Sequence, residues 1–171
     1  MDISYQQHLP QDFHPQSRVW IYQASRMFMI SEALEMEDMI CNFIAQWKSH
    51  GASVKGYANL FFGRFLVIMA DESNVSVGGC STDSSVHLVK AIEQQFKTDM
   101  FNRQLLAFIV KDKIELIPLS QLGYAVENGF INEHTLYFNN TVLTKKELEE
   151  KWLVPVKESW LASKITAEKH P

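Results

Sequence analysis

The sequence predicts an α+β fold: a central mixed or antiparallel sheet of about five strands, covered by two main helices, with a smaller C-terminal part of helix and hairpin. Residues 65–70 (FLVIMA) and 105–110 (LLAFIV) are apolar at every position, which is typical of strands buried on both faces. Residues 31–49 and 82–97 carry apolar side chains at helical spacing, which predicts the two helices.

The first elements follow a polar N-terminal segment. Residues 1–17 contain two prolines and several Gln and His residues, and they predict a flexible arm. Residues 18–22 (RVWIY) then predict the first strand. Ser31 is a candidate N-cap for the first helix, whose core stripe is Met36, Ile40, Phe43, Ile44 and Trp47.

The middle of the chain supplies a hairpin and the second helix. Residues 54–62 and 65–70 are expected to pair as a hairpin across Gly63. A polar loop leads from its second strand to the helix over 82–97. The strand at 105–110 then turns back into residues 114–117.

The last third changes character and is expected to pack as an appendage, 119–163, on the same core. It contains a short helix ending at Gly129, a strand at 135–138 and a capping-box pattern from Thr144 to Glu147. The expected organisation is therefore an arm, a single α+β domain over 18–163, and a tail over 164–171.

Composition excludes several function classes. The net charge is -4, and no run of Lys or Arg is longer than Lys145-Lys146, which argues against a nucleic-acid partner. No stretch approaches the roughly 20 apolar residues of a membrane span. Only two cysteines occur, of which Cys41 falls within a helical pattern and is expected in the core. A soluble, cytoplasmic protein is the simplest expectation.

The segment 78–87 (GGCSTDSSVH) contains the main candidate site. It follows a buried strand and opens the second helix, where free amide groups and the positive end of the helix dipole gather. One interpretation is a site for a small ligand or anion, formed by Gly79, Cys80, Ser81, Thr82, Asp83, Ser84 and Ser85. The other is ordinary helix capping, with Ser81 or Thr82 as the N-cap.

Cys80 is also a candidate catalytic nucleophile, because a helix start favours a thiolate. At about 100° per residue, Ser85 shares the apolar face of the helix, whereas Asp83 and His87 fall on the solvent side. A buried Cys80–His87 dyad is therefore not expected, and the general base would have to come from another part of the chain.

No metal or cofactor site is expected from the sequence. The six histidines are scattered, and no H-x-x-x-H or C-x-x-C spacing occurs. Carboxylates such as Asp71 and Glu72 are expected to be solvated loop residues.

Five segments carry a resemblance to a known family: Arg18–Gln23, Phe65–Glu72, Gly79–Val86, Leu136–Asn140 and Glu149–Trp152. On these residues the chain resembles a family of short, uncharacterised bacterial proteins that often carry the label "ABC transporter ATPase". The resemblance spans about residues 18 to 160. It implies a bacterial protein and supplies no catalytic residues.

The residues argue against the activity in that label. An ABC ATPase holds nucleotide phosphates in a G-x-x-x-x-G-K-[ST] loop, whose lysine reaches the β and γ positions. This chain contains neither Gly-Lys-Ser nor Gly-Lys-Thr, so we expect no ATP hydrolysis.

Two functions remain open at this point. The first is a non-enzymatic binding or interaction protein, because no complete catalytic constellation is visible. The second is a small hydrolase or transferase that uses Cys80 as its nucleophile. A small anion, a protein and a second copy of the chain all stay open as partners.

Overall fold

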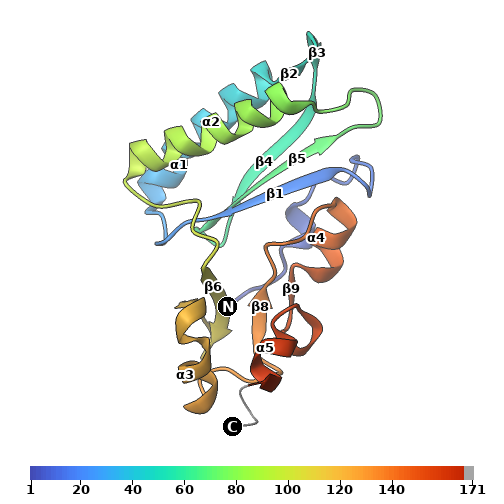
Figure 1. Cartoon of the computed structure of the whole chain (residues 1–171). Coiled ribbons are helices and arrows are strands. Elements are labelled where there is room, and N and C mark those ends of the chain that lie inside the picture. Colours follow the sequence, from blue (N-terminus) through green and yellow to red (C-terminus); the bar gives the residue numbers. More distant parts are fainter. Residues whose placement is uncertain (168–171) are drawn as a thin grey trace. The chain divides into compact units, whose positions relative to one another are not determined.

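The α+β fold is confirmed in the computed structural model, which describes residues 1–167. The described chain forms two compact units (Figure 1). Unit 2 comprises Ser4–Phe101 and Val142–Glu149, and unit 1 comprises Met1–Ile3, Asn102–Thr141 and the described residues from 150 onward. The strands divide into a three-stranded, a two-stranded and a four-stranded sheet, where one sheet of about five strands was expected.

The three-stranded sheet of unit 2 has the order β1 (Arg18–Gln23), β5 (Phe65–Asp71), β4 (Lys55–Phe61), and both pairings are antiparallel. All seven residues of β5 are buried, which confirms the central strand predicted from its unbroken apolar run. The expected hairpin joins β4 to β5, and its turn has positive φ angles at Phe62 and Gly63.

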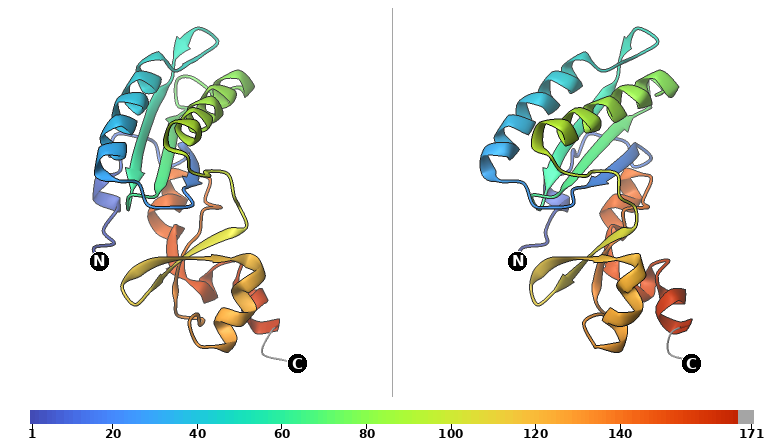
Figure 2. Two further views of the ribbon diagram at one scale, coloured as in Figure 1. Left: turned by 90° about the vertical axis from the view of Figure 1, so that its left-hand side faces the viewer. Right: turned by 60° about the vertical axis from the view of Figure 1, so that its left-hand side comes forward.

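Helices α1 (Ile30–Gln46) and α2 (Gly79–Phe96) lie side by side on one face of this sheet (Figures 1 and 2). Their apolar stripes pack against the side chains of alternate strand residues, including Tyr22, Leu66 and Ile68. Between α1 and β4 the short strands β2 (Lys48–Ser49) and β3 (Ala52–Ser53) form a hairpin, with positive φ at His50 and Gly51.

The other face of the sheet is where the structure departs most from expectation. The segment 1–17 is packed, not a loose arm: it contains the short 3-10 helix η1 (Gln6–His8), and Tyr5, Leu9 and Phe13 are buried. The hydroxyl of Tyr57 on β4 donates a hydrogen bond to His8 O at 2.7 Å. The buried side chains of Tyr5, Leu9 and Phe13 anchor this otherwise polar segment.

Residues 142–149 complete unit 2 and include the start of α4 (Lys145–Lys151). The predicted capping of α4 is confirmed, because Thr144 Oγ1 accepts the Glu147 N–H at 3.2 Å. Val19 N–H donates to Leu143 O at 3.0 Å, so residues 142–149 also cover the outer edge of β1.

Unit 1 contains the four-stranded antiparallel sheet, in the order β7 (Lys113–Pro118), β6 (Leu105–Val110), β8 (Leu136–Phe138), β9 (Leu153–Pro155). Its core includes residues from β6 and β8 and from the helices α3 (Leu122–Glu127) and α5 (Ala162–Ala167). Two 3-10 turns, η2 (Leu119–Gln121) and η3 (Val156–Glu158), connect these elements.

The predicted tail over 164–171 is described only in part. Residues up to 167 belong to α5, and 168–171 lie outside the described residues.

Candidate functional site

Helix α2 begins at Gly79, three residues before the predicted Thr82. Gly78 is the N-cap and has the extended backbone angles usual there, but glycine has no side chain to cap the first turn. The Gly78 N–H donates to Ser49 Oγ at 3.5 Å. Ser81 and Thr82 are therefore inside the helix and cannot act as the caps that the sequence suggested.

The hydroxyl groups of this segment all have main-chain acceptors. Ser81 Oγ donates to Lys48 O at 2.8 Å, and Thr82 Oγ1 donates to Gly78 O at 3.1 Å. Ser84 and Ser85 donate to the carbonyl oxygens of Cys80 and Thr82, at 3.0 and 2.6 Å. Each hydroxyl thus has a structural role within the protein.

Exposure divides the predicted ligand set. Ser81 and Ser85 are buried and face the protein interior, as the helical spacing predicted for Ser85. The exposed members are Gly79, Cys80, Asp83 and Ser84. The Ser81 carbonyl also accepts the indole N–H of Trp47 at 2.9 Å, which ties the helix start to the end of α1.

Cys80 is an exposed, free thiol in the first turn of α2. The structure brings one imidazole to this corner of unit 2: a Cβ added to Gly78 would lie 3.4 Å from His50 Nε2. His50 sits in the β2–β3 turn, far from Cys80 in the sequence, so the pattern of the sequence gave no signal for it.

Asp71 and Glu72 have internal partners. Asp71 Oδ1 accepts the hydroxyl and the N–H of Ser73, and Oδ2 accepts the His14 N–H at 2.9 Å. These hydrogen bonds hold the pKa of Asp71 well below its usual range, and the one from the Ser73 hydroxyl has the largest effect. Glu72 Oε2 accepts the Val77 N–H at 3.0 Å. Within residues 1–167 no group of three or more His, Cys, Asp or Glu side chains could hold a metal ion.

A different surface of unit 2 is open and apolar. We call it the α1–β4 groove; it is a hollow of about 420 Å³ lined by Ile30, Ala33, Leu34, Glu37, Ile40, Cys41, Ala58, Asn59, Leu60 and Gly63. Four large apolar side chains nearby are strongly exposed: Met27 at 57%, Met29 at 64%, Ile30 at 83% and Leu34 at 61%.

Sequence reasoning missed this groove because α1 has two rows of mostly apolar side chains along its length. The first, which includes Met36 and Ile40, was predicted and packs in the core. The second runs through Ile30, Leu34, Glu37 and Cys41 at spacings of four, three and four, and it lines the groove. Cys41 is therefore exposed, and the expectation that it belongs to the core is wrong.

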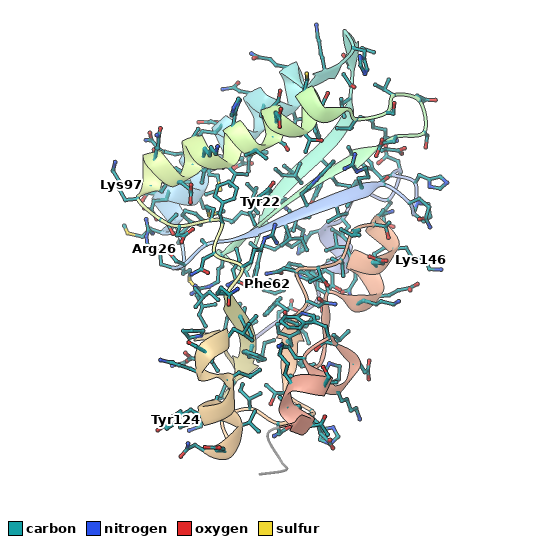
Figure 3. All side chains as sticks on the ribbon, viewed as in Figure 1. Tyr22, Arg26, Phe62, Lys97, Tyr124 and Lys146 are labelled. Atoms are coloured by element: carbon teal, nitrogen blue, oxygen red, sulfur yellow. The ribbon has the colours of Figure 1, made fainter. Side chains whose placement is uncertain are left out.

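The start of α1 is fixed by an ion pair. The Arg26 guanidinium donates two hydrogen bonds to the Glu32 carboxylate, both at 2.8 Å, and Glu32 Oε2 also accepts the Met29 N–H. These contacts lower the pKa of Glu32 to about 2, and the hydrogen bonds from Arg26 have the largest effect. Arg26 also donates to Phe96 O at the end of α2, beside Lys97 (Figure 3).

The chain was compared with known proteins, and no family model, no curated protein and no solved structure matches it. In the part of the chain that the structure describes, no helix combines the length and apolar character needed to cross a membrane.

Proposed function

We propose that this chain is a non-enzymatic binding protein and that the α1–β4 groove of unit 2 holds its partner. The observation that carries the proposal is the concentration of exposed apolar surface at the groove. Of the ten large hydrophobic side chains exposed in residues 1–167, four lie between Met27 and Leu34. Exposed apolar patches of this kind are typical of interaction sites.

The exposed side chain of Met27 belongs to the same surface as the groove. A Cβ added to Gly63, which lines the groove, would lie 3.1 Å from Met27 Cγ. Methionine side chains adapt their shape to a partner at small cost, which suits a binding surface. The polar groups that line the groove are one carboxylate, one thiol and one amide, from Glu37, Cys41 and Asn59.

A second hollow, of about 450 Å³ beside β7 in unit 1, supports the proposal less well. Its lining includes the charged side chains of Lys111, Lys113 and Glu115, and Phe130 is its one strongly exposed large apolar side chain. Burying unpaired charges costs free energy, so the apolar groove of unit 2 is the better binding surface.

Peptide display tests this proposal. A library of random 12-residue peptides is selected on the immobilised full chain, and the enriched peptides are measured by titration calorimetry. We expect micromolar binding that Leu34→Lys weakens at least tenfold, because the lysine places a charge in the apolar groove. The matched control is Leu143→Lys, another exposed leucine of unit 2, at 67% exposure and absent from the groove lining. Equal loss in both variants, or no enrichment, contradicts the proposal.

The second candidate is a small hydrolase or transferase that uses Cys80. It is favoured by the exposed thiol in the uncapped first turn of α2, with the His50 imidazole beside Gly78. Alkylation by iodoacetamide at pH 6 separates the two functions, with Cys41→Ser and Cys80→Ser each leaving one exposed thiol. Under our proposal both thiols react at the rate of free cysteine. Reaction of Cys80 at least tenfold faster than Cys41 favours the enzyme.

A small anion at the start of α2 is a narrower form of the binding function. Phosphate, sulfate and nucleotides are the probes, and thermal unfolding is the measurement. Because the hydroxyls of Ser81 and Ser85 donate to main-chain oxygens, we expect no shift of the melting temperature. A rise of the melting temperature with ligand concentration would indicate that the binding site is this helix start and not the groove. We also propose that the chain belongs to the bacterial family that it resembles and has no ATPase activity.

A further inference from the structure

Strand β4 lies at an edge of the unit 2 sheet. It pairs with β5 on one side, and within residues 1–167 no other strand pairs with it. The opposite edge strand, β1, is covered: Val19 N–H donates to Leu143 O, and Arg18 forms a bridge with Thr144. An open edge presents unpaired N–H and C=O groups to any extended chain.

One hydrogen bond within β4 and one from Val54, the residue just before it, indicate which residues of the strand face outward. Val54 N–H donates to Trp47 O at 3.0 Å, and Leu60 N–H donates to Asn59 Oδ1 at 2.9 Å. Both residues are at even positions and direct their amides away from β5. In an antiparallel strand alternate residues point to the same side, so Gly56 and Ala58 also direct their N–H and C=O groups outward.

The outward-facing edge and the groove adjoin one another. Ala58 and Leu60 line the groove together with Ile30, Leu34 and Cys41 of α1. A chain in this position would find hydrogen-bonding groups along β4 and apolar side chains on α1. That combination is the one used in strand addition, where the main chain provides affinity and alternate side chains enter pockets.

The negative charge of α1 indicates that the occupant of the groove carries positive charge. The helix carries Glu32, Glu35, Glu37 and Asp38 and contains no Lys or Arg. Glu32 is paired with Arg26, and Glu37 lines the groove. A second copy of the chain, paired through β4, would bring two such acidic helices towards each other, which is unfavourable.

Resting on the proposed function, we infer that the partner binds as an extended segment that adds a strand to β4 from Gly56 to Leu60. It pairs with the outward groups of Gly56 and Ala58 and with the Leu60 carbonyl, since the Leu60 N–H is already bonded to Asn59 Oδ1. About five residues of the segment pair with this edge, given a rise of about 3.3 Å per residue along a strand. Its apolar side chains alternate with polar ones, and a Lys or Arg lies opposite Glu37.

The first test is the Ala58→Pro variant of the full chain. Proline removes the outward N–H of residue 58 and leaves the ladder with β5, because an edge strand tolerates proline where its N–H faces solvent. We expect the enriched peptides to lose at least tenfold in affinity. Ala58→Val enlarges the side chain at the same groove position but keeps the N–H, so an equal loss in the two variants would contradict strand addition. An unchanged far-ultraviolet circular dichroism spectrum shows that Ala58→Pro is folded.

A second test leaves the protein unchanged. Enriched peptides are synthesised with single N-methyl groups at successive positions. Strand addition predicts that methylation at every second residue lowers the affinity at least tenfold and that the residues between tolerate it. Uniform tolerance along the peptide overturns the inference and replaces strand addition with another binding mode.

The outcomes separate this inference from the proposed function. If Leu34→Lys weakens binding while Ala58→Pro and N-methylation do not, the groove is the binding surface and strand addition is wrong. If sedimentation of the chain alone shows a dimer that Ala58→Pro dissociates, the occupant is a second copy and our choice of a basic partner segment is overturned. Enriched peptides with apolar residues at helical spacing would bind as helices and would also contradict strand addition.

Discussion

Replacing Gly56 by alanine tests how closely α1 packs against β4. A Cβ at this position would lie 2.7 Å from Trp47 Cε3, 3.0 Å from Cζ3 and 3.2 Å from Ile44 Cδ1. Trp47 is buried, and its indole N–H is held by Ser81 O, so the ring has little freedom to move. The added methyl group must therefore displace either α1 or the strand.

Two effects of this substitution oppose each other. Overpacking a core costs about 1–3 kcal/mol, whereas glycine to alanine stabilises by about 0.4–1 kcal/mol through the unfolded chain. The clash with a fixed ring is the larger effect, so we expect Gly56→Ala to lower the free energy of unfolding by about 1–2 kcal/mol. With a urea dependence of about 2 kcal/mol per molar, the unfolding midpoint falls by about 0.5–1 M.

Gly79→Ala is the matched control for this substitution. Nothing lies within 4 Å of a Cβ at Gly79, and the residue is the first of α2, where alanine is favoured. Urea unfolding followed by circular dichroism should show a midpoint equal to or above that of the wild type. If Gly56→Ala is as stable as Gly79→Ala, the close packing of Trp47 on β4 is wrong.

Three further predictions follow from individual contacts. Because the folded-state pKa of Glu32 is lowered to about 2 from 4.5, its stabilisation should be lost as the pH falls from 4.5 towards 2, and Glu32→Gln should flatten this part of a stability–pH profile. Phe108→Ala removes a fully buried ring of unit 1 and should cost about 3–5 kcal/mol in urea unfolding. Ser85→Ala should change stability by less than about 0.5 kcal/mol, because its hydroxyl bonds only within its own helix.

The elements were predictable where the local pattern is strong. The unbroken apolar run of β5, the core stripe of α1 and the capping of α4 by Thr144 all predicted what the structure contains. Pairing between strands was not predictable in the same way. An apolar strand such as β6 can be central to any sheet, and only the tertiary structure assigns it to β7 and β8.

The candidate site was predicted in position but not in detail. Serine and threonine are preferred N-caps, so the pattern placed the helix start near Thr82, whereas Gly78 occupies the cap. The N-terminal segment was misjudged because Tyr5, Leu9 and Phe13 are separated by polar residues. The groove was missed because an apolar residue such as Leu34 gives the same signal on an open surface as in a core.

The division of the two units along the chain has a consequence for synthesis. Unit 2 needs residues 142–149, and unit 1 is formed from three separate stretches. During translation the edge of β1 has no cover until Leu143 has left the ribosome, because Leu143 O accepts the Val19 N–H. The nascent sheet therefore has two open edges from the synthesis of β5, which ends at Asp71, until Leu143 has been added, and neither unit is formed by one uninterrupted stretch of the chain.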